Sequence, residues 1–190
     1  MDRKILTLTL TMSAAVAVAG ALGVSTPAPQ IRLVDNSIPI DPAPADPGDG
    51  SLADGQVLTP FDVQNPAIGR LDPALLTAVQ DAATAAAADG VTMTVTSGWR
   101  STDFQRRLMD DAVRTYGSAD IARQYVAPPE VSKHVIGEAV DIGGVGADQW
   151  LIANGSRFGL CQIYANELWH FELATDAAGI CPPLLPNAAG

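Results

Sequence analysis

The chain has 190 residues, of which 47% are apolar and 17% are charged, a composition typical of one globular domain with extensions. Its formal net charge is -10 and its sequence pI is about 4.3, so the chain would repel a polyanion. These values exclude nucleic acid as an expected partner.

The first 24 residues have the pattern of an export signal. Arg3 and Lys4 precede an uncharged run over residues 5–24, and small residues at 17–19 offer a cleavage site. The run is also about long enough to span a bilayer, so an uncleaved anchor is the alternative. We favour cleavage because the run is rich in Thr, Ala and Gly. In both cases we expect the remainder in the cell envelope or outside the cell, with membrane contact only if the segment is uncleaved.

Residues 25–66 are dominated by Pro, Asp, Ala and Gly. Such a composition cannot bury enough apolar surface to offset the entropy of ordering, so we predict an acidic spacer. A short apolar stretch within it, residues 56–61, could dock on the domain that follows. The predicted division is therefore a signal or anchor (1–24), this spacer, an ordered domain (67–183) and a tail (184–190).

Order is expected to begin near Leu71. Asp72 is a good N-cap for a helix, Pro73 fits the first helical position, and Gly90 ends the helix. Residues 91–96 then alternate apolar side chains with Thr, which is the period of a half-buried strand.

Short helices and strands are predicted for the rest of the domain. Thr102 and Gln105 resemble a capping box that opens the second helix. A third helical piece is expected over 118–125, and a helical turn over 148–153. The remaining apolar runs predict three short strands, over residues 139–142, 158–163 and 168–173.

Alternation along the last strand separates two faces. Trp169, Phe171 and Leu173 share one face and are expected in the core. His170 and Glu172 lie on the other face. The histidine is therefore expected to point toward a functional site rather than into the core.

The chain has only two histidines, His134 and His170, and each lies in a polar cluster beside apolar residues. Asp141 follows His134 by seven residues, and Gly137 between them lets the backbone turn. A catalytic zinc site needs three N or O ligands and one open position, and the two histidines with Asp141 supply that set. Glu167 could be the base for the reacting water, but its spacing from His170 requires the chain to bend between them. From these residues alone, a zinc site and two structural histidines both remain open.

Three ordered motifs resemble the VanY type of D-alanyl-D-alanine carboxypeptidases, which belong to the LAS group of peptidoglycan peptidases. Two motifs are similar to the zinc signature of that family, and a third resembles its segment between a strand and a helix. The resemblance covers about residues 91–172. The motifs are Ser132-x-His134-x-x-Gly137-x-Ala139-x-Asp141, Glu167-x-x-His170, and Ser97-Gly-Trp-Arg100-Ser101 with Gln105.

The resemblance implies a set of roles for the metal site. His134, Asp141 and His170 would bind one Zn²⁺, and Glu167 would be the general base. Arg100 would lie close to the scissile bond, where its fixed positive charge could stabilise the tetrahedral intermediate or hold a substrate carboxylate.

The same resemblance implies that Ser132 and Gln105 are substrate-binding groups. The structural alternatives are a turn residue for Ser132, a capping partner of Thr102 for Gln105, and an ion pair for Arg100. The stretch 161–166 replaces a more basic stretch in the family, which leaves substrate length and end preference open.

Cys161 and Cys181 fall in the part predicted to be exported, where an oxidising compartment permits a disulfide. Closing a loop of about 20 residues would stabilise the fold by roughly 3 kcal/mol. Buried free thiols and thiolate metal ligands are the alternatives. We favour the disulfide because the two cysteines lack the close pairing of zinc-thiolate sites.

Together these patterns predict an α+β domain with a small antiparallel sheet that carries the zinc site and is flanked by helices, as in the LAS and Hedgehog-like fold. The expected protein is an exported, monomeric zinc D,D-carboxypeptidase that hydrolyses the D-Ala-D-Ala end of peptidoglycan stem peptides. One alternative is a peptidoglycan endopeptidase of the same group, which a groove open at both ends would favour. Another is a non-catalytic, zinc-stabilised binding module.

Overall fold

The computed structural model describes residue 46 and residues 48–190. The proposed export signal (1–24) and most of the proposed spacer lie outside the described residues. Within the described part of the chain, no helix is long and apolar enough to cross a membrane.

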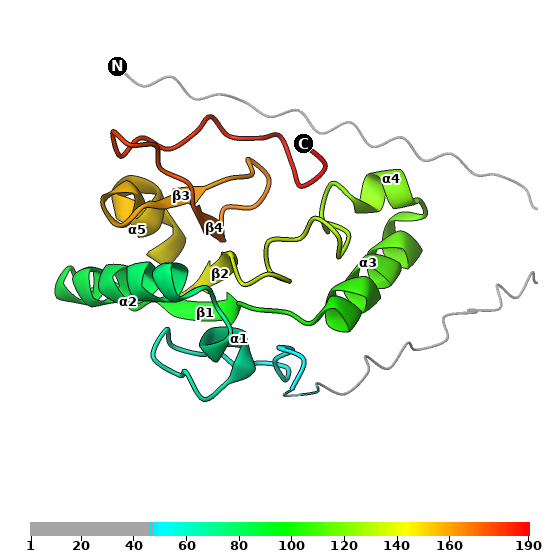
Figure 1. Cartoon of the computed structure of the whole chain (residues 1–190), viewed down its shortest axis with the longest axis horizontal. Helices are drawn as coiled ribbons and strands as arrows, with labels where there is room; N and C mark the ends of the chain where they lie inside the picture. The colour runs from blue at the N-terminus through cyan, green and yellow to red at the C-terminus, as the bar shows by residue number, and fades with distance from the viewer. Residues whose placement is uncertain (1–45, 47) are drawn as a thin grey trace, which may run out of the picture. The chain divides into compact units, whose positions relative to one another are not determined.

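Short strands and helices alternate along the described chain and form an α+β unit (Figure 1). The four strands make one antiparallel sheet in the order β1-β2-β4-β3. The predicted fold class is therefore confirmed. The elements are α1 (Pro66–Gly69), α2 (Pro73–Ala88), β1 (Thr94–Ser97), α3 (Thr102–Tyr116), α4 (Ala119–Ala122), β2 (Ala139–Gly143), α5 (Ala147–Asn154), the 3-10 helix η1 (Gly155–Phe158), β3 (Leu160–Gln162) and β4 (His170–Leu173).

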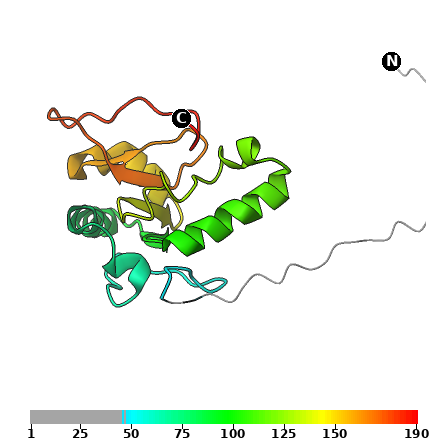
Figure 2. The same ribbon diagram turned by 45° about the vertical axis from the view of Figure 1, so that its right-hand side comes forward.

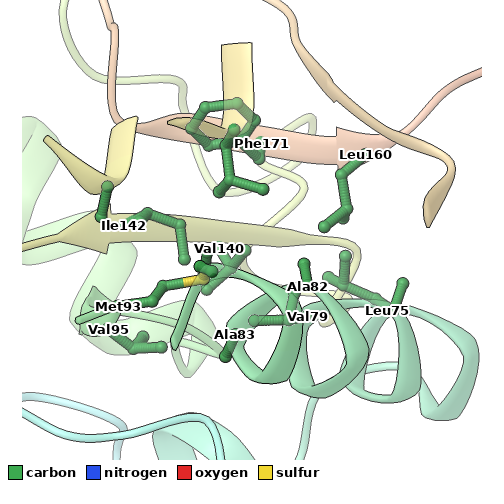
Figure 3. Packing of buried hydrophobic residues seen from close by; sticks show 14 of the residues in the cluster. Leu75, Val79, Ala82, Ala83, Met93, Val95, Val140, Ile142, Leu160 and Phe171 are labelled. Carbon is green, nitrogen blue, oxygen red and sulfur yellow. The ribbon is translucent and has the colours of Figure 1, made fainter. Parts of the chain in front are cut away.

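Four of the helices lie in two pairs. In Figures 1 and 2, α2 and α5 lie together on one side of the molecule, and α3 and α4 lie together on the other. The core forms between the sheet and α2, whose buried face consists largely of small side chains that allow close approach. Figure 3 shows this packing for Leu75, Val79, Ala82 and Ala83 of α2 with Met93, Val95, Val140, Ile142, Leu160 and Phe171.

The N-cap of α2 is the predicted residue, whereas the N-cap of α3 is not. Asp72 accepts hydrogen bonds from backbone N–H groups of the first turn of α2, and Pro73 is the first helical residue, as expected. The capping box predicted for α3 is wrong. The N-cap is Ser101, whose hydroxyl accepts from the backbone N–H of Phe104 at 3.1 Å, and this leaves Gln105 free to turn inward.

The core prediction for β4 holds for one of its three residues. Phe171 is fully buried, but Trp169 is 46% exposed and Leu173 is 41% exposed. The reason is that β4 is short: it begins at His170, so Trp169 lies in the preceding turn, and Leu173 is its last residue. Parity along the strand is correct, but of these three residues only Phe171 belongs to the buried core.

The N-terminal flank packs on the domain earlier than predicted. Leu58, in the stretch expected to dock, is buried and pairs with β1 through two backbone hydrogen bonds, of 2.7 and 3.2 Å. Asp49 is also buried, and its carbonyl accepts from the backbone N–H of Ser101 at 2.8 Å. We therefore propose that the ordered domain begins near residue 48 rather than at 67, with the spacer ending before it.

Candidate metal centre

The register of β2 and β4 brings two of the proposed zinc ligands together. Asp141 and His170 are direct partners in this antiparallel pair, so their side chains project to the same face of the sheet. Val140 and Phe171 form the neighbouring pair, project to the opposite face, and are fully buried in the core. Adjacent residues of the same two strands thus build the polar centre and the apolar core.

His134 reaches this centre from the loop before β2. The loop turns at Gly137, whose φ is 77° and whose N–H donates to the His134 carbonyl at 3.2 Å. A Cβ at this position would lie 2.6 Å from the carbonyl oxygen of Arg70, so only glycine fits. The turn expected between the first two ligands is therefore present.

The three donor atoms form a nearly equilateral triangle. His134 Nε2 is 3.3 Å from His170 Nδ1 and 3.4 Å from Asp141 Oδ1, and His170 Nδ1 is 3.3 Å from the same oxygen. Tetrahedral ligands at about 2.0–2.1 Å from a zinc ion are about 3.3–3.4 Å apart. The spacing of these atoms therefore fits one zinc ion, and all three residues are buried.

Both imidazoles are oriented by partners on their far side. His134 Nδ1–H donates to the carbonyl of Gly98 at 2.8 Å, and His170 Nε2–H donates to the carboxylate of Glu172 at 2.9 Å. These bonds direct the other nitrogen of each ring to the shared point, as the outer partners of metal-binding histidines do. Asp141 Oδ1 is buried at the same point with no hydrogen-bond donor among the described residues.

The electrostatics of the centre favour a cation. Burial alone raises the pKa of Asp141, but His134, His170 and Arg100 outweigh this and hold that pKa well below its usual range. Burial lowers the pKa of His170, but Asp141 and Glu172 raise it to about 9. The negative potential that stabilises a proton on His170 would equally stabilise a metal ion in its place.

Glu167 lies beside the metal centre, not within the triangle. The backbone N–H of His170 donates to the Glu167 carbonyl at 3.3 Å, so the chain bends between the two residues as their spacing requires. Glu167 Oε2 is 3.8 Å from His170 Nδ1, and its Oε1 is buried without a donor within the described part of the chain. Burial is the main cause of a raised pKa at Glu167. A carboxylate with this environment is suited to accept a proton.

Arg100 is partly buried next to the centre and is held by three side chains. Its Nε donates to Ser97 at 2.8 Å, its Nη1 to Gln105 at 3.1 Å and its Nη2 to Asp141 Oδ2 at 2.8 Å. Burial lowers the pKa of Arg100, whereas Asp141 and Glu167 raise it; a guanidinium nevertheless stays charged. The backbone N–H of Arg100 also donates to the carbonyl of His134 at 3.1 Å. This bond joins the loop that follows β1 to the loop that carries His134.

Gln105 and Ser132 differ in how free their polar groups are. Gln105 is buried, and its amide accepts from Arg100 while donating to the Ala127 carbonyl at 2.7 Å. Both ends of this side chain are therefore engaged within the protein. Ser132 is buried at the wall of a cavity of about 50 Å³ beside the centre, and its hydroxyl makes no hydrogen bond to another described residue.

Two residues at the centre had no role assigned from sequence. Glu172 orients His170. The alternation of side chains along β4 places both residues on one face, and this pattern could have indicated the contact from sequence. Tyr164 lines the cavity with its ring 5.0 Å from that of His170. No periodic pattern covers the loop that carries Tyr164, so no signal marked it.

The family model of the VanY D-alanyl-D-alanine carboxypeptidases matches residues 69–174. The chain belongs to the VanY family. The resemblance inferred from the three motifs is thereby confirmed. The part matched to VanY contains every residue of the centre described above and leaves out the segments 48–68 and 175–190.

A curated relative, the D-alanyl-D-alanine carboxypeptidase of Enterococcus faecalis (strain ATCC 700802 / V583), is 35% identical over 128 residues. The alignment covers 54% of this chain and 48% of the relative. The present VanY-family chain therefore spans about half the length of that protein.

Two solved structures of the family share the fold. One is a mutant of the vancomycin-resistance D,D-pentapeptidase VanY from a VanB-type cassette in complex with Zn(II), with a TM-score of 0.51 and 33% identity over 54% of this chain and 71% of that one. The other is VanYB in complex with D-alanine-D-alanine, with a TM-score of 0.51 and 30% identity over 70% of this chain and 80% of that one.

Proposed function

We propose that this chain is a zinc D,D-carboxypeptidase that hydrolyses the D-Ala-D-Ala end of peptidoglycan stem peptides. The observation that carries the proposal is the spacing of three buried donor atoms, which fits a tetrahedral zinc ion, with the Glu167 carboxylate beside them. One oxygen of that carboxylate is buried without a donor among the described residues. Family relatives that bind Zn(II) and D-alanine-D-alanine support the choice of metal and substrate. The activity of the curated relative supports the choice of reaction.

His134, Asp141 and His170 would hold the zinc ion. When bound at such a site, zinc polarises a carbonyl and lowers the pKa of a water molecule toward neutrality. The three side chains contribute geometry and charge: two neutral nitrogens and one carboxylate oxygen, each fixed by a backbone or side-chain partner.

Glu167 would move the proton. Its carboxylate would take a proton from the attacking water and deliver it to the nitrogen of the leaving D-alanine. The raised pKa caused by burial makes the group a better proton carrier near neutral pH than an exposed glutamate.

Arg100 would supply fixed positive charge. One guanidinium arm holds Asp141 Oδ2, which leaves Oδ1 of that carboxylate for the metal. The same cation, partly buried and close enough to Glu167 to interact with its charge, would stabilise negative charge that develops on the substrate carbonyl. Because all three partners hold the guanidinium before substrate arrives, no reorganisation is needed during the reaction.

Ser132 and Gln105 would serve the substrate in different ways. The Ser132 hydroxyl is free to hydrogen-bond a peptide in the cavity. Gln105 would act through Arg100, because both of its polar atoms already have protein partners. We therefore assign Ser132 to substrate binding and Gln105 to positioning.

The place of action would be the cell wall. Export directed by residues 1–24 would bring a monomeric enzyme to its peptide substrate, which lies outside the cytoplasm. The disulfide between Cys161 and Cys181 supports an oxidising location.

The test is digestion of a defined stem pentapeptide ending in D-Ala-D-Ala, with the products weighed by mass spectrometry. We expect the loss of one alanine, its abolition by a chelator, and its return on addition of zinc. An internal cut would contradict the carboxypeptidase assignment and favour the endopeptidase alternative. Zinc binding without hydrolysis of this or longer peptides would favour the binding module.

A further inference from the structure

The C-terminal segment, residues 181–188, lies outside the part matched to the family and is nevertheless firmly attached. Cys181 forms a disulfide with Cys161 of β3. Further along, the Leu185 N–H donates to the Ile163 carbonyl at 2.9 Å, and the Ala165 N–H donates to the Leu185 carbonyl at 2.8 Å. In Figures 1 and 2 this red segment follows the orange loop between β3 and β4.

The loop between β3 and β4 is in turn joined to the segment after α4. The Asn166 side chain donates to the carbonyl of Gln124 at 2.8 Å, across 42 positions of sequence. Three segments that are distant in the chain, 124–127, 163–166 and 181–188, therefore form one continuous rim. Two backbone bonds, a side-chain bond and a disulfide hold it together.

This rim borders the cavity at the metal centre. Tyr125 and Ala127 of the first segment, Tyr164 of the second and Ala188 of the third line it, together with His170 and Glu167. The cavity measures only about 50 Å³. An extended peptide advances by about 3.3–3.6 Å per residue, so a chain that continued past the scissile bond on this side would meet the rim within a residue or two.

We propose that the segment 181–188 is an end wall of the substrate cleft and restricts the enzyme to peptides that terminate directly after the scissile bond. The inference rests on the proposed function, under which the side of the cavity bordered by the rim would receive the departing D-alanine. Peptides extended beyond that residue are excluded by contact with the wall. The restriction would distinguish this chain from an endopeptidase of the same group.

The experiment compares two zinc-loaded proteins on two peptides. The proteins are the full chain and a variant lacking residues 184–190, which keeps both cysteines and every residue assigned to the metal centre. The peptides are identical up to D-Ala-D-Ala; one ends there with a free carboxylate, and the other continues for two glycines. We expect the full chain to favour the free-ended peptide by at least about tenfold in kcat/KM, and the variant to cleave both at similar rates.

Three outcomes would overturn the end wall: efficient cleavage of the extended peptide by the full chain, an unchanged preference in the variant, or an equal rise in both rates. The last would indicate a blocking segment instead of a wall. If the zinc-loaded full chain cleaved neither peptide, the proposed function would fail, and the end wall with it.

A second variant covers the case in which the deletion disturbs folding, which zinc content and thermal melting would reveal. Ala188→Trp enlarges one side chain of the wall in the intact chain. We expect KM for the free-ended peptide to rise by about tenfold with a smaller change in kcat, because the substrate end is crowded out. Ala177→Trp, the same substitution at an exposed position outside the wall, is the matched control and should leave KM unchanged. An unchanged KM in Ala188→Trp would contradict the position of the wall.

Discussion

The two faces of the β2–β4 pair differ in polarity: one carries charged side chains and the other carries buried apolar side chains. On one face, Asp141 and His170 lie among charged groups that are stable only with one another or with a metal ion. On the other, Val140 and Phe171 are fully buried among apolar side chains. The two pairs are adjacent in sequence, so in each strand a residue that faces the proposed metal centre is next to a residue that packs in the core. Substitutions on the two faces should therefore have separable effects.

The largest effect is expected at Glu167, on the polar side. Glu167→Gln keeps the shape of the side chain but removes its basicity, so kcat should fall by about 10²–10⁴-fold while zinc remains bound. Steady-state kinetics and zinc analysis of the same preparation measure both. Glu138→Gln, on the surface, is the matched control and should retain activity. Wild-type turnover in Glu167→Gln would remove this residue from the mechanism.

On the apolar face, Phe171→Ala should lower the free energy of unfolding by about 3–5 kcal/mol, because it empties a fully buried ring site. Denaturant unfolding of the zinc-loaded protein measures the loss. The folded fraction should keep its zinc, since the substitution faces away from the centre. Loss of zinc at full folding would show that the two faces are coupled.

Zinc itself should stabilise the protein through the polar face. At a free zinc concentration 100 times the Kd, binding adds about 2.7 kcal/mol to the free energy of unfolding. Chelation should therefore lower the melting temperature reversibly. In His170→Ala the chelator should have little effect, because one of three ligands is absent; a wild-type response would place the metal elsewhere.

A smaller effect is expected at Gln105, whose side chain connects Arg100 to the backbone of Ala127. Gln105→Leu leaves Arg100 Nη1 and the Ala127 carbonyl without partners, at a cost of about 1–3 kcal/mol in stability. Activity should fall as well, because the guanidinium loses one of its three supports. Gln149→Leu, on the exposed side of α5, is the control. An active and fully stable Gln105→Leu would show that Arg100 holds its position without this support.

The smallest effect is expected at Trp169, which shares strand parity with Phe171 but is 46% exposed. Trp169→Ala should lower the free energy of unfolding by about 1 kcal/mol, the average for single substitutions, because only part of its ring is buried. Denaturant melts of the two alanine variants side by side test this. A loss as large as that of Phe171→Ala would show that the position of a residue along the strand, and not its burial, predicts its contribution to stability.

Local rules account for the parts of the molecule that were predicted correctly. The Asp72 cap, the parity of His170 and Phe171 and the turn at Gly137 depend on residues a few positions apart. The metal-centre residues were also identified from sequence, because their types and order match a family motif. The amino-acid sequence, with its resemblance to a family, was thus enough to predict the fold class and the candidate ligands and to favour the disulfide that the structure contains.

Only the tertiary structure showed which contacts form between segments that are distant in the sequence. It brought both polar ends of Gln105 into hydrogen bonds, left Trp169 exposed and brought Ala188 to the cavity. The physical reason is that these contacts join segments whose pairing depends on packing and on which polar groups find partners after the core has formed. Such choices leave no periodic pattern along the chain, and so they became visible only when the segments were seen together.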